Sequence, residues 1–142
     1  MSVPMPNVRM LAVATATLVI VFMGGYAAGQ RRQAPPPENA GQSQELFGTM
    51  KLAGEIPGAE RFALRLRRIT VQPGGALALH NHVDRPAVTY LMQGQMTYYP
   101  EGKPPIVINP GQGAGEGRGT THWAENTGTV PAVWIAADIY VP

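Results

Sequence analysis

The 142-residue sequence has no cysteine and only three histidines, and charged residues make up just 14% of it. Without cysteine there can be no disulfide framework, no Cys-ligated zinc site, no iron–sulfur cluster and no thiol nucleophile. The 11 Lys and Arg residues against 9 Asp and Glu residues leave a formal charge of +2. No block of like charge is long enough to bind a phosphate backbone, so we expect no nucleic-acid partner.

Helical periodicity of useful length is also missing after the first thirty residues. Glycine and proline, with 17 and 14 residues, punctuate the chain heavily, but they stay below the share of roughly 25–30% that is typical of low-complexity chains. Short strands joined by turns fit this composition best. We therefore expect an all-β fold.

The N-terminal part of the chain carries a long uncharged and mostly apolar stretch, residues 10–28. Arg9 and the amino terminus precede an apolar run from Leu11 to Met23, which predicts a signal peptide over residues 1–29 that ends at Gly29. The alternative is a retained membrane anchor, because the uncharged stretch is about long enough to cross a bilayer as a helix. Both alternatives predict an exported domain, periplasmic or anchored and facing outward, with membrane contact only through this segment.

Residues 30–46 contain three consecutive prolines among Gln, Asn, Ser and Gly. Such a segment cannot bury enough apolar surface to fold, so we expect an extended linker there. The folded domain is then predicted over residues 47–142.

The segment Phe62–Val71 alternates in the period of a half-buried strand. This pattern predicts that Leu64 and Leu66 face inward and that the arginines at positions 65 and 67 face solvent. Pro73-Gly74-Gly75 should then turn the chain. Further strands are expected at Ala76–His82, Ala87–Met92, Gln95–Tyr99, Ile106–Ile108, in two runs around His122, and at Ala132–Tyr140. Strands at this spacing indicate a small sandwich or closed barrel.

The three histidines occupy two of these strands. His80 and His82 are two residues apart, so both side chains point to the same face of a strand, and His122 follows about forty residues later. Three imidazoles without cysteine suit a transition-metal ion such as Fe, Zn, Ni, Cu or Mn, and they do not suit magnesium or calcium. The competing interpretation is three unrelated, partly exposed histidines.

Two motifs around these histidines resemble those of the cupin superfamily. The first runs from Gly75 to Gly94 and reads G-A-L-A-L-H-N-H-V-D-R-P-A-V-T-Y-L-M-Q-G; the second runs from Pro110 to Asn126 and reads P-G-Q-G-A-G-E-G-R-G-T-T-H-W-A-E-N. In the second motif Gly119, His122 and Asn126 keep the family spacing. The resemblance implies a small antiparallel jelly-roll β-barrel that binds a divalent metal ion and a small-molecule ligand and often forms a homodimer.

The usual cupin ligand set is three histidines and one glutamate, but the position expected for the glutamate is Ala87. One alternative is a site of three histidines with open coordination positions, as described for some cupin-type thiol dioxygenases. The other is a substitute carboxylate. Glu116 has the same strand parity as His122, whereas Asp84 is better explained as a surface acid that pairs with Arg85. The predicted metal set is therefore His80, His82, His122 and Glu116.

Strand parity also predicts the surroundings of the site. Trp123 and Tyr90 should face outward, and the following residues should face inward around a small, mostly apolar cavity: Ala78, Thr89, Leu91, Ala124 and Asn126. Such a domain could be an oxidoreductase of the dioxygenase type or an isomerase, or a periplasmic module that binds a metal or small ligand without turnover. A third interpretation is a barrel whose metal site has decayed.

Overall fold

The chain divides into two units, residues 1–31 and 32–142, and a computed structural model describes residues 34–142, all in the second unit. The segment expected to be a signal peptide or an N-terminal hydrophobic helix lies outside the described residues. Within residues 34–142 the regular elements are eight β-strands. This part of the chain contains no helix long and apolar enough to cross a membrane.

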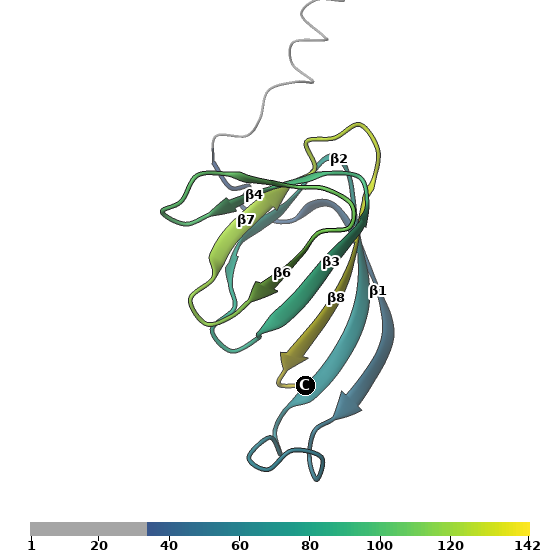
Figure 1. Cartoon of the computed structure of the whole chain (residues 1–142), viewed down its shortest axis with the longest axis vertical. Helices are drawn as coiled ribbons and strands as arrows, with labels where there is room; N and C mark the ends of the chain where they lie inside the picture. Colours follow the sequence, from purple (N-terminus) through teal and green to yellow (C-terminus); the bar gives the residue numbers. More distant parts are fainter. Residues whose placement is uncertain (1–33) are drawn as a thin grey trace, which may run out of the picture. The chain divides into compact units, whose positions relative to one another are not determined.

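All strand pairs are antiparallel, in the order β5-β4-β7-β2-β8-β3-β6, with β1 paired to β2. The strands are β1 (Ala40–Lys51), β2 (Ala63–Asn81), β3 (Ala87–Gln93), β4 (Met96–Pro100), β5 (Ile106–Ile108), β6 (Gly113–Glu116), β7 (Thr121–Glu125) and β8 (Ala132–Tyr140). They curl into a nearly closed barrel (Figure 1). The all-β, jelly-roll prediction is confirmed.

Strand β2 is a single long strand, and the turn predicted at Pro73–Gly75 is wrong. Residues 63–71 pair with β8, and residues 76–81 pair with β7, so the same strand serves both halves of the barrel. The change of partner needs a bend, which two glycines provide. Gly74 has a φ of +72°, and a Cβ on Gly75 would lie 2.8 Å from the backbone oxygens of Ala40 and Gln72.

The linker prediction is wrong for residues 40–46, which form the first part of β1. Nearly every residue of β1 pairs with β2, from Ala40 opposite Ala76 to Lys51 opposite Ala63. The strand is almost entirely exposed. A polar segment can therefore form this strand, because backbone hydrogen bonds to β2 hold β1 in place and burial of its side chains is not required.

The predicted faces of β2 are reversed. Leu64 and Leu66 are 36% and 41% exposed. Arg65 and Arg67 instead bind the carboxylate of Asp138, which is 1% exposed. A buried carboxylate without cationic hydrogen-bond donors is very unfavourable. Pairing Asp138 with the two arginines therefore contributes more to stability than burying the two leucines would.

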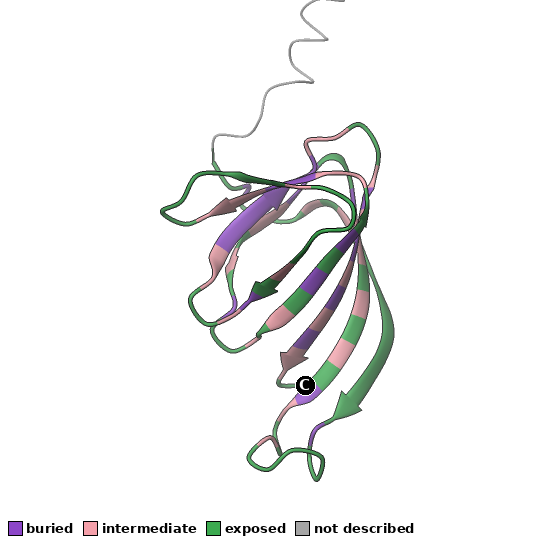
Figure 2. Cartoon of the chain, in the orientation of Figure 1, coloured by how far each residue is buried: buried purple, intermediate pink, exposed green. Residues whose placement is uncertain are grey.

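The core is a small cluster of buried apolar residues. It consists of Val71, Leu91, Met96, Ala124, Ala132 and Trp134. Along β3 buried residues alternate with exposed ones, and along β8 buried residues alternate with partly buried ones, as Figure 2 shows. Leu91, Ala124 and Asn126 are buried but do not line the cavity, so the predicted cavity lining is wrong for these three, and Tyr90 is 50% exposed. Trp123 is buried, and its ring stacks on that of Tyr99 with centroids 3.8 Å apart.

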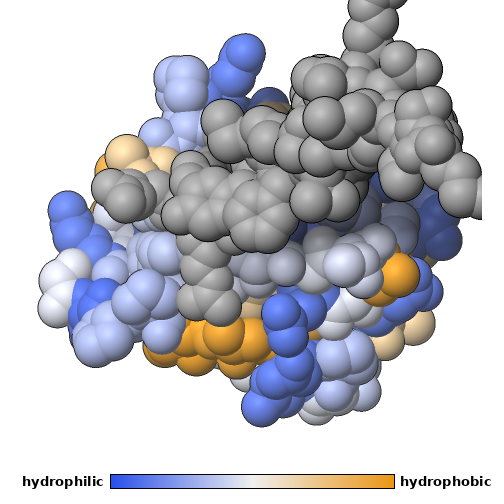
Figure 3. Space-filling view, turned by 90° about the horizontal axis from the view of Figure 1, so that it is seen from above, coloured by the Kyte–Doolittle hydropathy of each residue, from blue (hydrophilic) through white to orange (hydrophobic). Residues whose placement is uncertain are grey.

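Apolar residues also remain on the outside of the barrel. On β3, Val88, Tyr90 and Met92 are each at least half exposed, and in the view from above apolar side chains gather in a patch among polar ones (Figure 3). The homodimer implied by the resemblance stays a prediction.

Candidate metal centre

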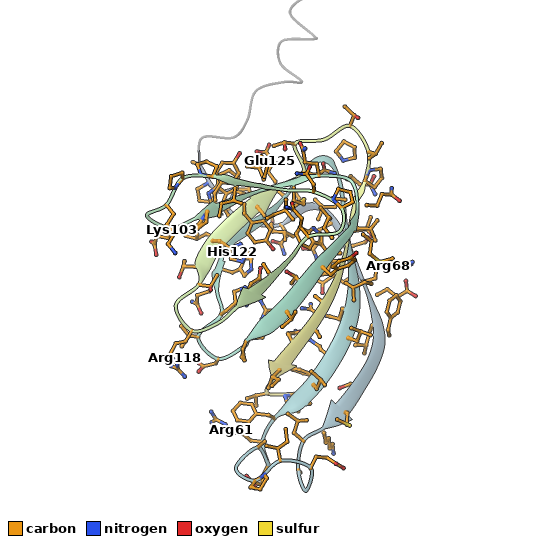
Figure 4. All side chains as sticks on the ribbon, viewed as in Figure 1. Arg61, Arg68, Lys103, Arg118, His122 and Glu125 are labelled. Carbon is orange, nitrogen blue, oxygen red and sulfur yellow. The ribbon has the colours of Figure 1, made fainter. Side chains whose placement is uncertain are left out.

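The pairing of β2 with β7 brings the three histidines together. His80 lies directly opposite His122 in the strand register, and His82 shares the face of His80. One ligand nitrogen from each ring lies within 4.8 Å of the others. His82 and His122 are 3% and 1% exposed, and Figure 4 shows His122 inside the barrel.

Backbone carbonyls orient two of the three rings. Nδ1 of His80 lies 2.8 Å from the carbonyl oxygen of Ala78, and Nδ1 of His82 lies 3.0 Å from that of Arg85. A carbonyl oxygen only accepts, so Nδ1 carries the proton in both rings. Each Nε2 therefore carries a lone pair, as a metal ligand needs, and Nε2 of His82 lies 3.2 Å from Nε2 of His122.

Glu116 supplies a carboxylate at the position left empty by Ala87. These two residues are opposite each other in the pairing of β3 with β6. The Glu116 side chain is 5% exposed, and its oxygens lie 3.4 Å from His82 Nε2 and 3.6 Å from His122 Nε2. Of the two acids considered from the sequence, the structure brings Glu116 to the histidines.

Asp84 lies away from this cluster. Its side chain is 79% exposed and its carboxylate is 4.0 Å from Arg118. The expectation that Asp84 is a surface acid agrees with this exposure, but its ionic partner is Arg118 rather than Arg85.

Tyr98 on β4 also belongs to the site, although the sequence did not single it out. Its hydroxyl donates a 2.8 Å hydrogen bond to Glu116 Oε1, and its ring stacks on His122 with centroids 4.6 Å apart. Strand β4 reads M-T-Y-Y-P, which has no polar and apolar alternation. For that reason nothing in the sequence indicates which of its two tyrosines faces inward.

Burial determines the electrostatics of the cluster. Desolvation lowers the pKa of His80 and His82, and it lowers the pKa of His122 to about 3. The three rings are therefore neutral near pH 7, as metal ligands must be. Desolvation raises the pKa of Glu116, with the Tyr98 hydrogen bond acting against this rise.

The histidines form part of the wall of a cavity of about 290 Å³. The lining includes larger apolar and aromatic residues, Ile69, Leu77, Tyr98 and Trp134. It also includes a charged group, in which Arg67 and Arg85 approach Asp138. Ala78 and Thr89 line it as predicted. Polar residues from β1 and just before it complete the lining: Asn39, Gln42 and Gln44.

This donor set fits a divalent transition metal. Three imidazoles in the neutral state and one carboxylate converge from β2, β6 and β7, and such nitrogen-rich sets suit Fe, Zn, Ni, Cu or Mn. Nδ1 of His122 is buried with no hydrogen-bond partner among the described residues. No hydrogen bond at Nδ1 therefore fixes the tautomer of this ring, and a metal ion at Nε2 would place the proton on Nδ1.

The sequence model of the cupin domain matches residues 67–138, about half of the chain, and this segment contains all four site residues. The chain belongs to the cupin family. No curated protein sequence matches this cupin.

Solved structures show the same fold. TT1209 from Thermus thermophilus superposes with a TM-score of 0.56 at 17% identity, covering 78% of this chain and 91% of that one. A predicted oxalate decarboxylase from Thermotoga maritima gives a TM-score of 0.53 at 22% identity, covering 78% and 96%. A recombinant oxalate oxidase in complex with glycolate gives 0.53 at 19% identity, and this cupin spans only 55% of that chain.

Proposed function

We propose that this cupin binds one divalent metal ion through His80, His82, His122 and Glu116. The observation that carries the proposal is the convergence of Nε2 atoms and a carboxylate at 3.4–3.6 Å in a buried cavity. Four side chains from three strands would not be brought together in this way by core packing. Without a cation, the carboxylate of Glu116 would face the lone pair on Nε2 of His82, 3.4 Å away, which is unfavourable.

The reaction we propose is oxidation or isomerisation of a small molecule bound in the cavity beside this centre. A bound metal ion supplies Lewis acidity, and redox chemistry where it is Fe, Mn or Cu. The chain positions the substrate against it. Apolar residues in the cavity lining would help to exclude water. Tyr98 donates a hydrogen bond to Oε1 of Glu116, which leaves Oε2 beside Nε2 of His82.

Metal content tests this proposal directly. Elemental analysis of the protein prepared without a His tag should give about one metal ion per chain, with most of it lost in His82→Gln. Asp84→Asn is the matched control, because it changes an exposed polar residue two positions along and should keep the metal. A folded wild-type protein that takes up no metal under any loading condition would contradict the proposal.

The second candidate is a binding module without turnover. It is favoured by the lack of an independent general base: within residues 34–142, the acids lining the cavity are Glu116, in the metal set, and Asp138, held by arginines. Oxygen consumption and product analysis with thiols, phenols and diketones separate the two functions. Turnover that disappears in His82→Gln identifies an enzyme, and metal binding with no turnover identifies a binding module.

We also propose that the domain is exported, through a signal peptide or anchor in residues 1–29. The support is the uncharged stretch from residue 10 to residue 28 after Arg9. Immunoblotting the expressed full chain distinguishes the two: cleavage lowers the mass by about 3 kDa, the mass of 29 residues. An uncleaved chain that stays in the cytosolic fraction would exclude both.

A further inference from the structure

One side of the cavity carries a surplus of positive charge. Asp138 is buried, and Arg65 already binds both of its oxygens, from Nε to Oδ1 at 3.0 Å and from Nη2 to Oδ2 at 2.9 Å. This bidentate pair balances one charge with one charge. Arg65 does not line the cavity, whereas Arg67 and Arg85 do. Two guanidinium groups therefore line the cavity, and the one carboxylate near them, that of Asp138, is already paired with Arg65.

The two arginines differ in how firmly they are held. Arg67 is 12% exposed, donates from Nε to Asp138 Oδ1 at 3.2 Å, and donates from Nη1 to Gln44. The nearest acidic partner of Arg85 is Asp138, whose Oδ2 is 3.9 Å from Arg85 Nε, too far for a hydrogen bond. With 37% of its side chain exposed, Arg85 keeps most of its planar donor fork available to a ligand.

Arg85 is also placed next to the metal centre. Its backbone carbonyl accepts from Nδ1 of His82. After burial, which is the main cause, the charge of Arg85 also lowers the pKa of His80 and His122. Arg85 and the three histidines line the same cavity, so a ligand bound there lies beside both.

The rest of the lining offers no unpaired carboxylate to an organic cation. Of the two acids that line the cavity in the described part of the chain, Asp138 is held by arginines, and Glu116 by Tyr98 and the histidines. The residues contributed by β1 and the segment before it are neutral amides, which hydrogen-bond a ligand but add no charge. The volume of about 290 Å³ is at the small end of the range for ligand sites.

We propose that the cavity selects small carboxylates, with Arg85 as the residue that binds the carboxylate group and Arg67 as its second cationic neighbour. This inference rests on the proposed function, because it assigns a ligand class to the same site. A planar guanidinium fork matches the two oxygens of a carboxylate, whereas an uncharged amide has one acceptor oxygen and no charge. The fork also matches a phosphate, so the test below includes inorganic phosphate.

The test compares three small carboxylates, propionate, lactate and benzoate, each with its amide, by calorimetry on the metal-loaded full chain. At least one acid should bind about tenfold or more tightly than its amide, because a charge-assisted hydrogen bond is lost in the amide. Arg85→Gln should remove this preference and keep the carbonyl that orients His82. Arg85→Lys should retain part of it, since charge remains without the fork.

Arg118→Gln is the matched control, because it removes the same charge from an exposed arginine, 78% exposed, that points away from the barrel (Figure 4). It should leave the preference within about twofold. Three results would overturn the assignment: no acid preferred over its amide, inorganic phosphate bound as tightly as the best acid, or equal losses in the two glutamine variants.

Metal content measured in the same samples separates the two proposals. Metal retained without any preference for acids means that the ligand class is wrong while the metal site stands. If the wild-type protein holds no metal, the proposed function fails, and the acid-to-amide comparison on metal-free protein still decides the ligand class.

Discussion

At the scale of the residue, the carboxylate of this site belongs to β6, whereas the cupin motif expects it on β3. Ala87 and Glu116 are direct cross-strand partners, so a side chain at either position starts from the same part of the cavity wall. Paired positions have Cβ atoms about 4.5–5.5 Å apart. This distance is within reach of a glutamate side chain from either strand.

We therefore expect the carboxylate to be transferable between the two strands. Glu116→Ala should weaken metal binding by at least about tenfold, because even the hydrogen-bonding partners of metal ligands contribute that much. The double variant Ala87→Glu with Glu116→Ala should regain a large part of the loss. Competition with a chelator of known affinity measures both variants.

Glu101→Gln, at an exposed position in the loop after β4, controls for the change of net charge and should bind metal as the wild type does. If Glu116→Ala binds metal unchanged, the three histidines suffice and Glu116 is no ligand. A double variant no better than the single one would show that the two positions are not equivalent.

At the scale of the element, the sequence indicated most strands but missed how β2 is used. The histidine strands could be predicted because H-x-H and the parity of Glu116 depend only on the period of a strand. The bend at Gly74 and Gly75 could not, because Pro-Gly-Gly is equally typical of a turn. Which one forms depends on β7 and β8, which lie far away in the sequence and pair with the two halves of β2.

The face of β2 was missed for a related reason. Alternating Leu and Arg predicts arginines in solvent, unless a buried acid from another strand needs them. Asp138 is that acid, and it lies about seventy residues away from Arg65 and Arg67. Burial is the largest single effect on the pKa of Asp138, and it raises this pKa. The hydrogen bond from Arg65 and the charges of the three neighbouring arginines, Arg65, Arg67 and Arg85, together outweigh it, so the pKa of Asp138 stays below its usual value.

The bend in β2 makes a prediction about stability. Gly75→Ala would place a Cβ 2.8 Å from two backbone oxygens and 3.0 Å from Val71, and the backbone cannot yield without disturbing the pairing of β1 or β7. We expect a loss of about 1–3 kcal/mol in the free energy of unfolding, measured by denaturant titration.

Gly115→Ala on β6 is the matched control. A Cβ there meets nothing within 4 Å, so this variant should be as stable as the wild type or slightly more stable, because alanine restricts the unfolded chain. Equal stability of the two alanine variants would show that the close contacts at Gly75 are relieved at no cost.

At the scale of the whole molecule, the buried histidines should make the metal-free protein sensitive to acid. The pKa of each of His80, His82 and His122 is lowered in the folded state, chiefly by desolvation. Below about pH 6.5 the unfolded chain binds protons on these residues and the folded chain does not. Stability therefore falls as the pH drops from about 6.5, with the contribution of His122 continuing to about pH 3. Glu116 acts in the opposite direction, because its raised pKa stabilises the folded state at low pH, but one carboxyl group opposes three imidazoles.

We thus expect the midpoint of thermal unfolding, measured with a chelator present, to be lower at pH 5 than at pH 7.5. His122→Phe, which removes the histidine with the largest of these pKa shifts, should reduce the difference between the two midpoints. Saturating metal should raise the midpoint at pH 7.5, since a ligand at a hundred times its Kd stabilises the folded state by about 2.7 kcal/mol.

Equal midpoints at pH 5 and pH 7.5 in the metal-free protein would contradict the pH prediction. They would mean that the folded chain takes up protons as readily as the unfolded one, because the histidines are accessible to solvent. Burial would then not explain why the histidines are neutral near pH 7.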